Sequence, residues 1–352
     1  MLKSDFLLFS FVIMVIEKIG EELSKVISSY SIKEDSLLYN GKEFAIDSGN
    51  FAAIETVGAL DSVDSNSAKE VCFIDGGQAE VLMGGSFCVS FIRVAAAGFL
   101  NGKKTDIRRH EFYFLTYAQD RGGEIFYVSK VFANDDFELL IREEDLIVSS
   151  RDGNLQSGLQ RASISKVTNM ARRFAELELA RRIGIELSDS GYVVLDGILQ
   201  ASFTGEEKIL DGLGDNVFGL AKTSQLFTRE GNNPCVLLNS LVPKELATWS
   251  YRIIDMACFV KLHEKSRHIF RFEGKKNIGV WDEVLPLLVG LSTDPIFLGY
   301  PYGLVFVDQI ARVSEQERRS LKIKFLFLTK GNSDLANYLA TNDAHSILDS
   351  IG

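Results

Sequence analysis

The sequence predicts an α/β protein in which a mixed β-sheet is flanked by helices. A cluster of strand-like segments comes first: a hairpin over residues 71–99, then 110–118 and 124–132, all rich in aromatic and β-branched residues. An unbroken helical pattern follows over residues 163–187, and residues 191–203 form the next strand-like segment. Antiparallel strands, a long helix and a further strand together predict an α/β fold with a mixed sheet.

This order of elements is the connectivity of ribonuclease H-like domains, with an additional helical region at the C-terminus. After residue 203 we expect another strand over 216–225 and a strand pair over 249–274. Helices are expected over residues 281–291, 302–312, 314–328 and 332–349. The predicted fold is therefore a ribonuclease H-like mixed sheet flanked by helices.

Two parts are expected along the chain: an N-terminal helix and loop-rich acidic segment (residues 1–69), and the domain built on the sheet (70–352). An apolar run of eleven residues, Phe6 to Ile16, is shorter than the ~20 residues of a membrane span. No A-x-A-like cleavage site follows it, as a secretory signal would require. We expect either a buried helix or a translation start at Met14, which makes residues 1–13 a gene-model artefact, in preference to a membrane anchor.

Charge and cysteine usage exclude some classes of function. A net charge of −10 argues against a protein that coats nucleic acid or anionic membrane by charge alone. Cys72, Cys88 and Cys258 lie in apolar runs and are expected to be buried free thiols, which fits a cytoplasmic setting. The chain contains no G-x-x-x-x-G-K-[ST], H-E-x-x-H or G-x-S-x-G motif. ATP hydrolysis by the chain itself is therefore not expected.

Two similar acidic motifs, "VCFIDGGQ" and "YVVLDGIL", place Asp75 and Asp196 at the end of an apolar strand and before a glycine. Carboxylates at the ends of neighbouring strands repel one another unless a cation lies between them. Mg²⁺ and Mn²⁺ prefer such oxygen ligands. The pattern predicts a metal site, with a structural turn at both positions as the alternative.

The helix between these motifs offers a third carboxylate, in "ARRFAELELARR". Helical periodicity favours Glu178, because it falls on the apolar face of Phe174 and Leu177, whereas Glu176 points the other way. The choice stays open, since the helix is apolar on both sides. Either glutamate could instead be a surface residue paired with an arginine four residues away.

Six motifs occur in a fixed order: "FIDGG" (73–77), "AELELA" (175–180), "VLDGIL" (194–199), "GLAKTSQL" (219–226), "RHIFRFE" (267–273) and "LGYPYGLVFVDQIARV" (298–313). On these motifs, over about residues 70–350, the chain resembles the NurA family. These are nucleases that partner the hexameric HerA ATPase in DNA end processing.

The resemblance implies a two-metal-ion deoxyribonuclease, a 5′–3′ exonuclease and/or single-strand endonuclease, with Mn²⁺ or Mg²⁺ ions ~4 Å apart. The family's metal-binding Asp, Glu, Asp set and its accompanying Tyr and further residue fall here on Asp75, Glu176 or Glu178, Asp196, Tyr300 and Asp308. Tyr300 could alternatively be an aromatic that packs a loop. Lys222 is expected to meet a DNA phosphate as a point charge, or else to be a strand-end lysine in solvent.

The implied partners are DNA, a HerA-type hexameric ATPase and a second copy of the chain, with no membrane. Gly77 and Ile198 stand where the family often has Ser, and Asp308 stands where some members have His. These departures support an alternative, a catalytically inactive family member that still docks on the ATPase ring. A third alternative is an RNA-directed ribonuclease H-like enzyme.

Overall fold

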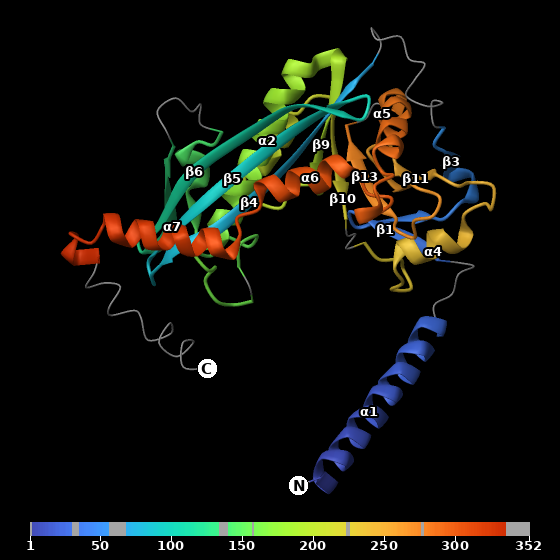
Figure 1. The fold of residues 1–352 in the computed structure, drawn as a ribbon, viewed down its shortest axis with the longest axis horizontal. Coiled ribbons are helices and arrows are strands. Elements are labelled where there is room, and N and C mark those ends of the chain that lie inside the picture. Colours follow the sequence, from blue (N-terminus) through green and yellow to red (C-terminus); the bar gives the residue numbers. More distant parts are fainter. Residues whose placement is uncertain are drawn as a thin grey trace.

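The computed structural model describes residues 2–29, 35–55, 68–133, 140–156, 158–222, 226–275 and 278–335. Helix α1 (Leu2–Ser29) stands apart from the rest of the molecule (Figure 1). The side chains of residues 16–29 are all exposed. The expectation of a buried helix over the apolar run Phe6 to Ile16 falls, apart from the exposed Ile16, on side chains outside those described. None of the helices in the described ranges has the length and apolar character needed to span a bilayer.

A single large mixed sheet dominates the fold, and its central strands are the long antiparallel β4 and β5 with two shorter strands parallel to β4. In order across the sheet, the strands are β3 (Phe51–Ala53), β11 (Trp249–Ile254), β12 (Ala257–Lys261), β13 (Phe270–Gly274), β10 (Val217–Ala221), β9 (Gly191–Asp196), β4 (Glu70–Met83), β5 (Phe87–Leu100), β6 (Lys103–Arg121), β7 (Glu124–Phe132) and β8 (Val148–Ser149). β9 pairs parallel with both β4 and β10, and the other pairs are antiparallel. The predicted α/β class with a mixed sheet is confirmed.

Two helical layers cover the two faces of this sheet. Helix α2 (Lys166–Leu187) packs Phe174 and Leu177 against Ile74 on one face. On the other face, α5 (Ile278–Gly290) and α6 (Tyr302–Ala311) pack against side chains that include Phe73 and Val194. Figure 1 shows α6 running across β4 and β5. Because strand residues alternate between faces, the two faces of β4 are buried under different helices.

Smaller elements complete the body around this sheet. The hairpin of β1 (Ser36–Tyr39) and β2 (Lys42–Ala45) forms a separate small sheet. The remaining helices are α3 (Glu206–Asp211), α4 (Pro234–Leu241) and α7 (Glu315–Leu328), with short 3₁₀ turns η1 (Ser48–Asn50), η2 (Glu143–Leu146), η3 (Ser188–Ser190) and η4 (Pro295–Phe297). Cys72, Cys88 and Cys258 are buried free thiols, as expected.

Several predicted boundaries differ from the structure. The expected strand pair over 249–274 is three strands, and the segment before residue 69 contains three short strands. The strand predicted over 191–203 ends at Asp196, because the chain turns there into a loop held by side chains from other elements. Most of the helix expected over 332–349 lies outside the described residues.

The prediction that Asp75 ends its strand is wrong, because β4 continues to Met83. What ends beside Asp75 is the parallel pairing with β9, whose last register pair is Ile74 with Leu195. Asp75 therefore lies within a long strand, at the point where its parallel neighbour leaves it.

The end of α6 lies very close to β4. A Cβ atom on Gly77 would be 2.0 Å from the Ala311 carbonyl oxygen, so only glycine fits there. The same turn is held by Arg93 of β5, whose Nη1 donates to the Arg312 carbonyl oxygen at 3.0 Å. Gly77, one of the departures from the family pattern, is thus explained by packing.

We expect Gly77→Ala to lower the free energy of unfolding by about 1–3 kcal/mol, because the new methyl group overpacks a backbone contact. Thermal denaturation measures this. Gly290→Ala is the control, since nothing lies within 4 Å of a Cβ atom at Gly290. Equal melting temperatures for the two variants would contradict the close approach of α6.

Candidate active site

Asp75 and Asp196 lie side by side where β4 and β9 separate. Asp196 is the last residue of β9, and Ile74, the residue before Asp75, makes the last pair between the two strands. Strand alternation places both aspartates on the face covered by α6. Burial, together with the nearby carboxylates of Glu176 and Asp196, raises the pKa of Asp75 to about 7. The site thus concentrates negative charge with little water to screen it.

Glu176 reaches this site from α2 on the opposite face. Its side chain is buried, and burial raises its pKa despite an ion pair with Arg172 at 2.6 Å. Arg172 also donates to the Gly76 carbonyl oxygen at 2.9 Å. A Cβ atom on Gly76 would lie 2.3 Å from Glu176 Oε1, so the missing side chain is what lets the carboxylate approach β4.

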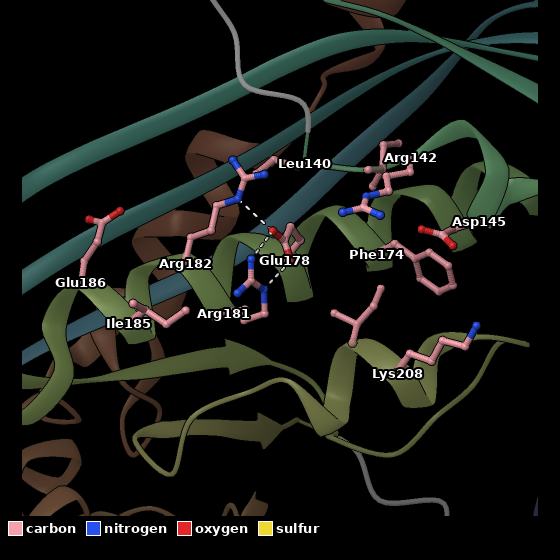
Figure 2. A pocket seen from close by; sticks show the side chains of 12 residues that line it. Leu140, Arg142, Asp145, Phe174, Glu178, Arg181, Arg182, Ile185, Glu186 and Lys208 are labelled. Atoms are coloured by element: carbon pink, nitrogen blue, oxygen red, sulfur yellow. Dashed lines mark hydrogen bonds and ion pairs between the residues drawn. The ribbon is translucent and has the colours of Figure 1, made fainter.

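Glu178 lies elsewhere, in a pocket of about 720 Å³ lined by α2, η2 and α3 (Figure 2). Its carboxylate binds Arg181 at 2.7 Å and Arg182 at 2.9 Å. Partial burial raises its pKa, but hydrogen bonds from both arginines lower it overall. The prediction from periodicity that Glu178 faces the aspartates is wrong. Because α2 is buried on more than one side, its apolar pattern does not single out one face.

Tyr300 joins the site through its hydroxyl group, which donates to Asp196 Oδ1 at 3.1 Å. Its ring is fully buried against Phe270 and Phe297, with centroids 5.1 and 4.9 Å away. The ring therefore packs a loop, as one alternative expected, and the hydroxyl group also contacts a candidate ligand. Burial, followed by the charge of Asp196, raises the pKa of Tyr300 well above its ordinary value. The phenol keeps its proton and acts as a donor.

Lys222 and Asp308 lie at the edge of the site. Lys222 Nζ contacts Asp196 Oδ2 at 2.5 Å and lies 5.2 Å from the centroid of the Tyr300 ring. Asp308 of α6 forms an ion pair with Arg312 at 2.7 Å, and its charge contributes to the raised pKa of Asp75. Lys222 is thus paired with Asp196 at the site, with its side chain still 38% exposed.

The loop after Asp196 is fixed by two buried ion pairs that the sequence reasoning missed. Arg173 of α2 donates to the Ile198 carbonyl oxygen and binds Glu206, which is fully buried, at 2.8 Å. On the other side, Glu273 of β13 accepts from the Leu199 N–H at 2.7 Å. Charged residues within the otherwise apolar segment "IFRFEG" were the available signal.

Glu273 also ties the N-terminal hairpin to this loop. It pairs with Arg271 at 3.0 Å and accepts from the hydroxyl group of Tyr39, in β1, at 3.0 Å. Gln200 of the loop donates to the same carboxylate at 3.2 Å. Elements from distant parts of the chain therefore hold the backbone beside Asp196 in one conformation.

The donor set suits a hard divalent cation, since Asp75, Asp196 and Glu176 offer only carboxylate oxygens. Across the described ranges, however, no three His, Cys, Asp or Glu side chains form a group that could hold a metal ion. Two of the carboxylates are paired instead with Lys222 and Arg172. A bound cation would have to share or displace these side chains.

A family model described as the NurA domain matches residues 69–313. The chain belongs to the NurA family. The match contains every candidate residue from Asp75 to Asp308 and confirms the resemblance found in the motifs. No curated protein matches the chain.

Solved structures similar to this NurA protein are distant. The Ciona intestinalis endonuclease V bound to inosine-containing DNA is 11% identical, with a TM-score of 0.36 over 74% of this chain and 90% of that one. The catalytic domain of human endonuclease V is 10% identical, with a TM-score of 0.37 over 78% and 92%. Aquifex aeolicus Argonaute is 11% identical, with a TM-score of 0.30 over 69% and 28%. At these scores the similarities carry no argument about function.

The structure shows what the three departures of this NurA chain from its family's pattern contact, and it gives a packing reason for Gly77. Ile198 contributes its backbone carbonyl to Arg173, a contact that any residue can supply. Gly77 accommodates the α6 backbone. Asp308 keeps an acidic group within electrostatic reach of Asp75. None of the three disrupts the contacts that surround the candidate ligands.

We expect Asp75→Asn to stabilise the folded chain at pH 8 relative to wild type. Since the pKa of Asp75 is about 7 when folded and near 3.8 otherwise, the folded state holds the proton more tightly. The stability that protonated Asp75 contributes to the folded state is therefore lost as pH rises from about 4 to 7. In EDTA, the melting temperature of the variant should exceed that of wild type by about 2 °C or more at pH 8, and by less at pH 5.

Glu178→Gln is a control of opposite sign, because the pKa of Glu178 is lowered in the folded state. This variant should melt below wild type at pH 8. An Asp75→Asn variant that is equally or less stable than wild type at pH 8 would show that Asp75 is not under electrostatic strain.

Proposed function

We propose that the chain is a metal-dependent nuclease that hydrolyses phosphodiester bonds in DNA. The observation that supports it most is that Asp75 and Asp196 follow the last register pair of β4 and β9, with Glu176 near enough for its charge to raise the pKa of Asp75. Carboxylates that repel one another in this way favour a cation. Membership of the NurA family supports the same function.

Asp75 and Asp196 would hold the ions, and Glu176 would complete the ligand set. Bound Mg²⁺ or Mn²⁺ would lower the pKa of a ligated water and stabilise charge on the leaving oxygen. Tyr300, which keeps its proton, fixes the orientation of Asp196 through its hydroxyl group. Lys222 supplies a positive charge beside Asp196 that can contact a phosphate oxygen. Arg172 holds Glu176 in position.

A DNA cleavage assay with a Mn²⁺ titration tests this function. Cleavage should stop with EDTA, and both Asp75→Asn and Glu176→Gln should lower the rate about 10²-fold or more, because metal ions contribute several kcal/mol to catalysis. Calorimetric Mn²⁺ titration of the same variants should show weaker binding. Glu178→Gln, which alters the neighbouring pocket, should retain cleavage and ion binding.

Two outcomes would contradict the assignment. Loss of activity in Glu178→Gln with Glu176→Gln unaffected would place the ligand on the other side of α2. A wild-type protein that cuts neither DNA nor RNA with Mn²⁺ would support the inactive docking protein, and one that cuts RNA alone would support an RNA-directed enzyme.

We further propose that the chain acts as a homodimer on a HerA-type hexameric ATPase. Support comes from the family, from the net charge of −10, which disfavours tight DNA binding by the chain alone, and from the lack of a phosphate-binding ATPase motif. Co-expression with the ATPase of the same organism should give a stable complex whose DNA digestion is stimulated and ATP-dependent. Equal digestion with and without that ATPase would count against the partnership.

A further inference from the structure

The loop between β12 and β13, residues 262–269, is a basic surface on an acidic protein. Lys265, Arg267 and His268 are exposed, and Glu264 is the carboxylate among them. Within the described residues, the side chains of Lys265 and Arg267 make no hydrogen bond or ion pair. Two exposed cations next to the exposed His268 ring form a surface suited to a nucleic-acid strand, which offers both phosphates and flat bases.

The loop backbone is held in a defined conformation. The Lys265 N–H donates to His263 Nδ1, and the Ser266 N–H donates to the His263 carbonyl oxygen, both at 3.2 Å. The His268 N–H donates to Ser266 Oγ at 3.1 Å, and Ser266 itself is buried. The exposed side chains therefore project from a fixed frame.

A continuous series of contacts leads from this loop to the active site. The His268 ring meets Phe297 edge-on at 5.3 Å, and Phe297 stacks on Tyr300 at 4.9 Å. Tyr300 in turn hydrogen-bonds Asp196. Two aromatic rings, those of Phe297 and Tyr300, thus connect His268 of the basic loop to Asp196, a candidate metal ligand.

We propose that this loop is a subsite for the DNA strand that extends from the reacting phosphate. This rests on the proposed nuclease function. Lys265 and Arg267 bind backbone phosphates, and the exposed ring of His268 stacks with a base. Ile296, which precedes Phe297 in η4, is 73% exposed and adds apolar surface to this turn. An unpaired base can reach such a surface, whereas the bases of a duplex are stacked inside it, so the subsite fits a single strand.

Binding of a fluorescent ten-nucleotide oligo(dT) in EDTA tests the subsite without requiring cleavage. Lys265→Gln with Arg267→Gln should weaken binding and make the slope of log K against log salt less negative by about 1.4, at ~0.7 for each phosphate contact. Lys130→Gln with Arg151→Gln is the charge-matched control, on β7 and beyond β8 at the far edge of the sheet. This control should bind like wild type.

His268→Ala should weaken binding about fivefold or more, and His268→Phe should restore it, because stacking needs a flat ring rather than a histidine. An unchanged salt slope in the Lys265/Arg267 variant, failure of His268→Phe to rescue, or no binding of oligo(dT) by wild type would each overturn the subsite. Equal losses for a blunt duplex would overturn its single-strand character. If the variants behave as expected but wild type does not cut DNA, the nuclease function fails and the subsite stands.

Discussion

The candidate site is constrained above all by electrostatic repulsion between its buried and partly buried carboxylates. Asp75, Asp196 and Glu176 come from two strands and a helix. Burial, followed by the charges of Glu176 and Asp196, raises the pKa of Asp75 to about 7. A folded chain tolerates such a group only when other contacts stabilise the surrounding structure. The contacts that hold the carboxylates in place are therefore as much a part of the site as the carboxylates themselves.

The contacts that stabilise the site come from the helical layers on both faces of the sheet. On the α2 face, the absent side chain of Gly76 admits Glu176, and Arg172 holds it. On the α6 face, Tyr300 is fixed by its aromatic neighbours and binds Asp196. The loop after Asp196 is held from two sides by buried ion pairs. These contacts hold the backbone around the carboxylates before any ligand arrives, and a cation has only to share or displace Lys222 and Arg172.

Sequence patterns predicted the features that depend on residues close together in the chain. The Asp-Gly repeats led to Asp75 and Asp196, and the order of strands and helix led to the mixed sheet. Periodicity failed on α2, because a helix buried on several sides has no single apolar stripe to indicate which glutamate faces the aspartates. Glu273 and Glu206 were missed because their partners lie far away in sequence, and only the folded chain brings Tyr39, Arg173 and the loop after Asp196 to them.

The central claim is that Asp75, Asp196 and Glu176 share a divalent cation. An anomalous difference map from crystals grown with Mn²⁺ tests it most directly. We expect density between Asp75 and Asp196 within bonding distance of a Glu176 oxygen, with Lys222 moved away from Asp196. Ordered carboxylates with no anomalous density among them, or a Mn²⁺ ion bound at Glu178 instead, would contradict the claim.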